Sequence, residues 1–180
     1  MSNGRDLTGH RSVFLGAVTS DLLSTAVENS WFDHEEDNRL LGFGKGVGGT
    51  VESRRYFMDF VKPKETFLPQ GIYLRGKPAG VCGVDVVSSK HKTGILHFYL
   101  APENRLYKVA VTSILALCRT FFDNMGYRLE FHCLRINKPA IKFFKHLGFT
   151  QESIKKSSYW MDNNVYDTVV LRLLRKDWEG

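Results

Sequence analysis

Residues 95–134 read ILHFYLAPENRLYKVAVTSILALCRTFFDNMGYRLEFHCL, and this stretch decides the fold. The apolar run Ile95–Leu100 predicts a strand, and the alternation in Tyr127–Leu134 predicts another. Between them, apolar residues recur at helical spacing until Gly126, which predicts a long amphipathic helix. This apolar stripe consists of Ala110, Ile114, Leu117, Phe121 and Met125. A strand–helix–strand unit crosses over with a right hand, so we expect the two strands to be parallel neighbours in one sheet.

Shorter periodic segments lie on both sides of this unit. Thr66–Leu74 and Ala79–Val87 read as antiparallel strands joined by a turn at Arg75–Pro78. The other predicted elements are a short strand within residues 7–15, helices at Asp21–Trp31, Val51–Val61 and Lys138–Leu147, and strands at Gln151–Trp160 and Val165–Leu174. We therefore expect residues 1–180 to form a single α/β domain, with a mixed, mostly antiparallel sheet and helices on both faces.

The composition is that of a globular protein with a basic balance. The chain has 180 residues, 43% of them hydrophobic, and a formal net charge of +6. It contains no apolar run near the roughly 20 residues of a membrane span, and its first residues have no apolar signal-peptide core. These features predict a cytoplasmic protein without membrane contact. The positive charge favours acidic partners, nucleic acid among them, although a solvated basic face is the plainer interpretation.

The cysteine and histidine patterns argue against a metal site. Cys82, Cys118 and Cys133 are widely spaced in apolar surroundings, which indicates buried small side chains rather than a disulfide or metal framework. The six histidines include no HExxH pair. We therefore expect no bound metal.

A glycine tract, GFGKGVGG, occupies residues 42–49. It invites comparison with a phosphate-binding loop, but no strand clearly precedes it and the Walker spacing is absent. A mobile loop beside a binding site is the interpretation that we favour. On that interpretation Gly44, Gly46 and Trp31 lie where the acceptor substrate enters.

The turn from the Ile95–Leu100 strand into the long helix is a candidate anion site. The first N–H groups of a helix lack internal partners and carry the positive end of its dipole. Arg105 and Lys108 add two positive charges there. An ordinary turn with solvated basic side chains is the alternative.

Several motifs, taken in order, resemble the GNAT acyltransferase superfamily, and within it the Rim-type branch that acetylates the N-termini of ribosomal proteins. The resemblance runs nearly end to end. It rests on Leu7-Thr-Gly9 with Val13-Phe-Leu15, Trp31, Gly83, Phe98-Tyr-Leu-Ala-Pro-Glu103, Asn137-Lys-Pro-Ala140, Leu147-Gly-Phe149, Asp167 with Leu171, and Asp177-Trp178. It implies the GNAT fold and transfer of an acetyl group from acetyl-CoA to an amine.

The resemblance also implies where acetyl-CoA binds. The backbone of Phe98, Tyr99 and Leu100 would bond its pantetheine arm, and Asn137 would touch its middle section. The pyrophosphate would lie in the loop formed by Arg105, Leu106, Tyr107, Lys108, Val109 and Ala110.

The chain departs from the family pattern at two places. The family loop carries two glycines where this chain has Leu106 and Lys108. Glycine lets a phosphate approach the backbone closely, so we expect the charges of Lys108 and Arg105 to compensate for its loss. Many relatives carry a tyrosine acid where this chain has Phe144, which lies at the cofactor site but cannot donate a proton.

The proton-transfer groups are predicted from their place in the sheet. Attack of an amine on a thioester needs a group that takes the amine's proton. His97 and Asp85 lie on the strands that would floor the site, and histidine titrates near neutrality. A hydrogen-bonded structural histidine is the alternative. Glu28 and Asp33, near Trp31, could recognise a cationic amine or be solvated.

The predicted function is acyl-CoA-dependent N-acyltransfer from acetyl-CoA to a primary amine, by a monomer or homodimer. The acceptor would be a protein N-terminus or a small amine. The alternative is a protein of the same fold whose altered cofactor loop serves as a nucleic-acid- or protein-binding module, or which transfers a group to a nucleic acid base.

Overall fold

A computed structural model describes residues 13–31, 33–41, 51–124 and 126–178. Within these residues, seven strands form one sheet in the order β1-β2-β3-β4-β5-β7-β6. The strands are β1 (Val13–Gly16), β2 (Gln70–Leu74), β3 (Lys77–Ser88), β4 (Thr93–Leu100), β5 (Arg128–Leu134), β6 (Thr150–Met161) and β7 (Asn164–Leu174). All neighbouring pairs are antiparallel except β4 and β5.

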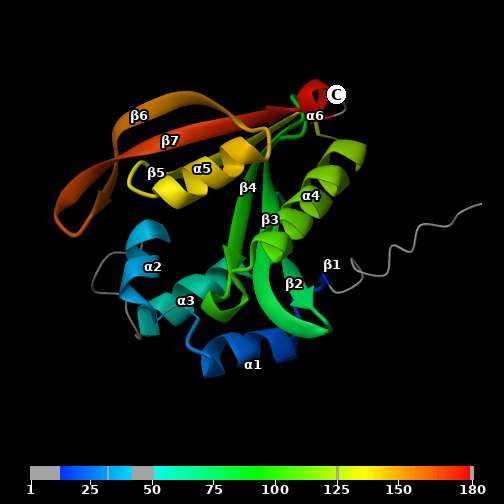
Figure 1. Cartoon of the computed structure of the whole chain (residues 1–180), viewed down its shortest axis with the longest axis vertical. Coiled ribbons are helices and arrows are strands. Elements are labelled where there is room, and N and C mark those ends of the chain that lie inside the picture. Colours follow the sequence, from blue (N-terminus) through cyan, green and yellow to red (C-terminus); the bar gives the residue numbers. More distant parts are fainter. Residues whose placement is uncertain (1–12, 32, 42–50, 125, 179–180) are drawn as a thin grey trace, which may run out of the picture.

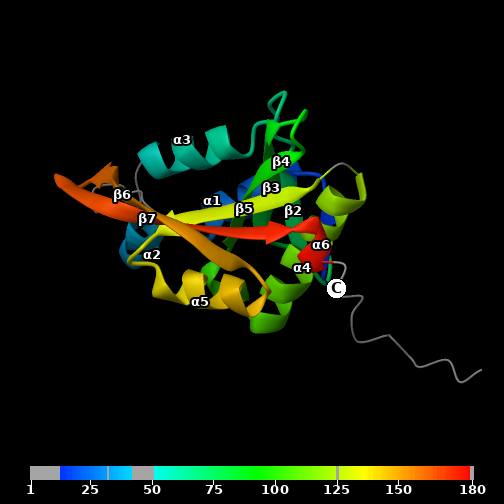
Figure 2. The ribbon, with the colours of Figure 1, turned by 90° about the horizontal axis from the view of Figure 1, so that it is seen from above.

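Helices cover both faces of this sheet. They are α1 (Ser20–Glu28), α2 (Glu35–Leu41), α3 (Val51–Phe60), α4 (Tyr107–Asn124), α5 (Lys138–His146) and α6 (Arg175–Trp178), with a short 3-10 helix at Pro102–Asn104. Seen from above, α1 and α3 lie on one side of the sheet, and α4 and α5 lie on the other (Figure 2). The predicted mixed sheet with helices on both faces is confirmed.

The strands β4 and β5 separate soon after they begin. They pair in parallel from Thr93 opposite Arg128 to Ile95 opposite Glu130. Beyond this point β4 continues along β3 to Leu100, while β5 continues along β7 to Leu134. In Figure 1 the two strands start together and run apart, which leaves a wedge between them. The predicted parallel neighbours are thus confirmed, and their divergence creates the space in which a site can form.

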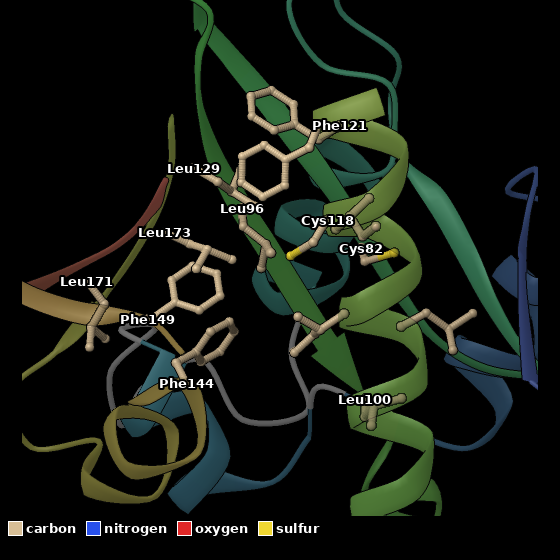
Figure 3. Packing of buried hydrophobic residues seen from close by; sticks show 14 of the residues in the cluster. Cys82, Leu96, Leu100, Cys118, Phe121, Leu129, Phe144, Phe149, Leu171 and Leu173 are labelled. Carbon is tan, nitrogen blue, oxygen red and sulfur yellow. The ribbon is translucent and has the colours of Figure 1, made fainter. Parts of the chain in front are cut away.

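The main core lies between the sheet and the face that carries α4 and α5. The predicted stripe on α4 is buried at Ile114, Leu117 and Phe121, which pack against Leu96 and Leu129 of the diverging strands. Figure 3 shows Phe121 close to Leu129, with Phe144 and Phe149 gathered near Leu173. Burial of one such side chain stabilises the fold by roughly 1.5–3 kcal/mol. This packing holds both edges of the wedge in place.

A second core supports the opposite face. Leu22 of α1, Phe57 of α3 and Trp31 pack there against Tyr73 and Tyr99 of the sheet. Thr19 begins α1 as a cap, because its side chain accepts a hydrogen bond from the Leu22 amide. The residues that alternate along β4 therefore serve different cores, with Leu96 and Leu100 on one face and Tyr99 on the other.

Several element boundaries differ from the sequence prediction, and one helix was not predicted. The first helix ends at Glu28 rather than Trp31, because Asn29 caps it and Ser30 adopts a positive φ of 50°. The strand predicted from Thr66 starts only at Gln70, after Pro69, which has no backbone N–H to donate. The helix α2 was not predicted, because the acidic stretch from Asp33 to Asp37 shows no helical period of apolar residues.

The three cysteines are free thiols. Cys82 and Cys118 are buried, and burial raises the pKa of each to about 12. Burial also raises the pKa of the half-buried Cys133, to about 11. Thiols with raised pKa values stay protonated at neutral pH and are poor nucleophiles. Over the described residues, no helix combines the length and apolar character that a membrane crossing requires.

Candidate active site

The wedge between β4 and β5 holds a cavity of about 170 Å³. Leu96–Tyr99 of β4 line one side, and Phe131–Leu134 of β5 line the other. We call this the wedge cavity. Leu40 and Leu41 of α2, Phe57 and Phe60 of α3, and Asn137 also line it. The opening thus has two strand walls and a largely apolar lining.

A second cavity, of about 450 Å³, lies between the start of α4 and the helix α5. We call it the mouth cavity. Phe98, Tyr99, Phe131 and Asn137 line both this cavity and the wedge cavity, so the two are neighbours. Its other lining residues are Asp37, Leu40, Leu41, Leu100, Arg105, Leu106, Tyr107, Ala110, Pro139, Ala140, Phe143 and Phe144. The two cavities thus adjoin one another between the α4 N-terminus and the sheet.

The N-terminus of α4 borders the mouth cavity. The Ala110 amide donates to the Leu106 carbonyl at 3.0 Å, which closes the first helical turn. The amides of Tyr107, Lys108 and Val109 precede this bond and have no acceptor within the helix. The first turn contains no acidic residue. These N–H groups and the helix dipole suit a phosphate.

The side chains of this loop point in several directions. Leu106, Tyr107 and Ala110 line the mouth cavity, and the Tyr107 ring lies edge-on to Phe143 with centroids 5.9 Å apart. Val109 is buried in the core, so only its backbone can meet a ligand. Lys108 lines a different hollow, beside Asp21 and Glu103.

Arg105 is held by α2. Its guanidinium makes two hydrogen bonds to the Asp37 carboxylate, at 2.6 and 2.8 Å, and its Nε donates to the Leu100 carbonyl at 3.3 Å. Burial alone would lower the pKa of Arg105, but the bonds and charge of Asp37 outweigh burial and raise it. Arg105 therefore fixes α2 over the mouth in this structure, and its phosphate role remains a prediction.

Asn137 joins two helices of the site, α5 and α2. Its Oδ1 accepts from the Ala140 amide at 3.1 Å and so caps α5, and its Nδ2 donates to the Leu40 carbonyl of α2 at 3.3 Å. Phe144 is buried in the mouth wall, stacked on Phe131 with ring centroids 3.7 Å apart. The predicted residues Phe98, Tyr99, Leu100, Asn137 and Phe144 are thus brought together at the mouth.

Trp31 lies behind the site rather than in it. Its ring is fully buried and donates from Nε1 to Glu103 at 3.0 Å, while its carbonyl accepts from the Tyr99 hydroxyl. With no exposed surface, the ring can influence an acceptor only through the residues that it positions. Gly44 and Gly46, the other predicted acceptor contacts, lie outside the described residues.

His97 lines the wedge cavity and also a cavity of about 260 Å³ on the opposite face from α4. Asp59, Phe60, Lys64, Phe67 and Asp85 complete that second cavity, so the predicted pair His97 and Asp85 is brought together. The His97 ring lies edge-on to Phe60 and Phe67. Burial lowers the pKa of His97 although the Asp85 charge opposes this, so the imidazole is neutral at pH 7.

Gly83 makes room for this arrangement. It pairs with His97 across β3 and β4, and a Cβ at this position would clash with the Phe67 ring. The absent side chain therefore lets Phe67 pack over the strand beside His97. No cluster of three or more metal-binding side chains occurs among the residues that the structure describes.

The prediction from sequence missed a second imidazole. His132 of β5 lines the wedge cavity, and its Nε2 lies 2.6 Å from Oε2 of Glu130. The signal was present in the alternation of Arg128, Glu130 and His132 along one strand face. Only the divergence of the strands shows that this face meets the wedge.

Comparison with known protein families identifies the family of this chain. Residues 49–170 match the acetyltransferase (GNAT) domain. This match spans more than half of the chain, and the protein therefore belongs to the GNAT acetyltransferase family. A search of curated proteins found no match.

Solved structures share the fold at low sequence identity. The spermidine N-acetyltransferase of Vibrio cholerae, in complex with CoA and spermine, is 12% identical over 95% of this chain and 100% of its own, with a TM-score of 0.76. RimL, the ribosomal L7/L12 alpha-N-protein acetyltransferase in complex with CoA, is 14% identical over 91% and 94%, with a TM-score of 0.76. The microcin C7 self-immunity acetyltransferase MccE, in complex with acetyl-CoA and AMP, is 16% identical over 91% and 92%, with a TM-score of 0.76. The molecules that these three proteins act on or bind differ, so the likeness establishes the fold of this chain and leaves its acceptor open.

Proposed function

We propose that the protein transfers the acetyl group of acetyl-CoA to a primary amine. One observation carries this proposal: β4 and β5 separate after Ile95 and Glu130, and the resulting wedge adjoins an uncapped helix N-terminus. A linear thioester fits this shape, with its phosphates at α4 and its acyl end beside His97. Both ends of this shape thus have the chemistry that acetyl transfer needs.

The donor would be held by backbone groups more than by side chains. Among the described residues no strand pairs with the β5-facing edge of β4 beyond Ile95, so the backbone groups of the Phe98–Leu100 segment that point to this edge can bond the pantetheine amides. The amides of Tyr107, Lys108 and Val109 would meet the pyrophosphate. In our proposal the Leu106 side chain does not block the pyrophosphate from these amides. Lys108 and Arg105 add positive charge from nearby.

The chemistry is direct attack by the amine. The nitrogen lone pair forms a bond to the thioester carbon, the carbon–sulfur bond breaks, and its electron pair leaves on the CoA sulfur. His97 takes a proton from the nitrogen as the new bond forms and returns it to the sulfur. Its lowered pKa suits this double duty, because a neutral imidazole accepts readily and the imidazolium is a good donor.

The resemblance to the Rim-type branch supports an amine as the acceptor. We propose a protein N-terminus or a small amine, in keeping with the ribosomal-protein and polyamine acceptors of the solved relatives. The family match does not favour the alternative of a protein that only binds nucleic acid.

Calorimetry and mass spectrometry test the proposal. The wild-type chain should bind acetyl-CoA and CoA at micromolar to submillimolar concentration, and should acetylate members of a panel of benzylamine, spermidine and short peptides. His97→Gln should retain CoA binding but lose acetylation by about 100-fold, the usual size of a lost acid–base group. Absence of CoA binding at millimolar concentration would refute the proposal. Tight nucleic-acid binding with a steep salt dependence, and no acetylation, would support the alternative.

A further inference from the structure

The wedge carries a second histidine with surroundings unlike those of His97. His132 lies on β5, across the wedge from His97, and its Nε2 is hydrogen-bonded to Oε2 of Glu130 at 2.6 Å. The residue opposite it on β7 is Val170. A carboxylate that orients an imidazole is the arrangement that prepares a histidine for proton transfer.

Glu130 is held as an anion. Arg128 donates to its other oxygen from Nε at 2.8 Å, and Arg128 also pairs with Glu152 of β6. Burial alone would raise the pKa of Glu130, but the hydrogen bonds from His132 and Arg128 outweigh burial and lower it. An ionised carboxylate can only accept hydrogen bonds, so Nε2 of His132 must carry the proton of this bond. When the ring is uncharged, its Nδ1 is therefore the acceptor nitrogen.

His132 also lines a second hollow, separate from the wedge cavity. It lines the wedge cavity and, with Leu41, Lys155 and Tyr159, a separate hollow of about 310 Å³ beside the β6–β7 hairpin. A proton taken up in the wedge could leave through this hollow. The titratable and charged groups around the ring include His97 on β4, Arg128 and Glu130 on β5, Glu152, Lys155 and Tyr159 on β6, and Arg172 on β7, which lies opposite Glu130 in the strand register.

Acetylation of an alkylammonium ion requires two proton transfers. The ion R–NH₃⁺ must first lose one proton to become a nucleophile, and the attacking nitrogen must lose a second as the C–N bond forms. The balanced reaction gives the amide, CoA–SH and one proton released to solvent. His97 and its returned proton account for the second transfer only.

We propose that His132, oriented by Glu130, is a further catalytic residue that removes the first proton from the incoming ammonium group. The proton moves to Nδ1 of His132 and leaves to water through the hollow beside the hairpin, and no oxidant or other reactant is needed. Glu130 acts as a positioning residue. The inference rests on the proposed function and deepens it, since it assigns the site to amines that arrive protonated.

The test compares His132→Gln with His97→Gln across pH, with benzylamine as the acceptor. At pH 7 both variants should lose about 100-fold in kcat/KM. At pH 10 the amine is largely neutral in solution, so His132→Gln should recover to within about 5-fold of wild type while His97→Gln stays slow. With aniline, which is neutral at pH 7, His132→Gln should be nearly as fast as wild type.

Three controls make the outcome decisive. Glu130→Gln, which keeps the shape of the side chain, should show the same recovery at high pH with a smaller loss at pH 7, and CoA affinity and melting temperature should match wild type for His132→Gln. A loss by His132→Gln that is equal at pH 7 and pH 10, or no loss at pH 7, would overturn the inference while wild-type activity upholds the proposed function. If wild type acetylates neither amine but acetylates a peptide or spermidine, the same pH comparison is made with that acceptor. If it acetylates none, the proposed function fails and the inference fails with it.

Discussion

The two helices that border the mouth cavity begin in opposite ways. The first turn of α5 is closed by its own residues, because Asn137 accepts from the Ala140 amide and Pro139 has no N–H to satisfy. The first turn of α4 begins at Leu106, an apolar residue that cannot cap. One N-terminus is therefore satisfied by its own residues, whereas the first amides of the other have no acceptor within their helix and border a cavity. The difference indicates which helix the chain keeps available for an anion.

The strongest test of this comparison gives α4 a charged cap. Leu106→Asp should satisfy the free amides and place a carboxylate where the pyrophosphate would lie. Like charges about 4 Å apart cost roughly 4 kcal/mol at an effective dielectric constant of 20, so we expect CoA affinity to fall by at least about 100-fold. Calorimetry measures the affinity.

A neutral variant separates charge from capping. Leu106→Asn should raise the free energy of unfolding by about 1 kcal/mol, as a cap does, but weaken CoA much less than Leu106→Asp. Equal CoA affinity for wild type and Leu106→Asp would place the phosphates away from α4.

Removal of the α5 cap should act mainly on stability. Asn137→Ala loses the cap and the bond to Leu40, and we expect the free energy of unfolding in urea to fall by about 1–2 kcal/mol. CoA affinity should fall about tenfold through the displaced α2. Asn137→Asp keeps the capping oxygen but loses the donor to Leu40, so it should retain more stability than Asn137→Ala. An unchanged unfolding midpoint for Asn137→Ala would show that this cap contributes nothing.

Variants of Arg105 and of its partner Asp37 test whether α2 competes with the cofactor for the Arg105 guanidinium at the mouth cavity. Asp37→Asn weakens the ion pair and frees the guanidinium for a phosphate, so CoA should bind about 3- to 10-fold more tightly, or roughly 1 kcal/mol. Arg105→Gln should remove this gain when combined with Asp37→Asn. Weaker CoA binding by Asp37→Asn would mean that the position of α2 matters more than the freed charge.

Lys108 should have the smallest effect. Its side chain lines the hollow beside Asp21 and Glu103 and not the mouth cavity. Its charge therefore acts on the phosphates at a distance and is screened by salt, and Lys108→Ala should weaken CoA by about 2- to 5-fold. Lys90→Ala, in the distant β3–β4 turn, is the matched control for net charge. A loss near 100-fold would show that Lys108 turns to bind phosphate directly.

Much of the fold followed from local pattern. The stripe from Ala110 to Phe121 and the apolar run Ile95–Leu100 predicted α4 and β4, because each period matches one kind of backbone geometry. The parallel crossover followed from chain handedness, which needs no knowledge of side-chain contacts. Helix α2 escaped prediction because its seven residues hold too few apolar positions to show a period. It is held by tertiary contacts, those of Asp37 with Arg105 and of Leu40 with Asn137.

The amino-acid sequence alone predicted the mixed sheet of the GNAT fold and the strand-to-helix turn, and it selected His97, Asn137 and Phe144 as candidate site residues. Only the tertiary structure decided how these residues are used. The divergence of β4 from β5 brings His132 and Glu130 to the wedge, Asp37 occupies Arg105, and the α4 helix turns Lys108 away from the mouth. The physical reason is the separation along the sequence over which each feature acts. Periodicity and capping involve residues a few positions apart, whereas cavities and ion pairs join residues that are far apart in the sequence.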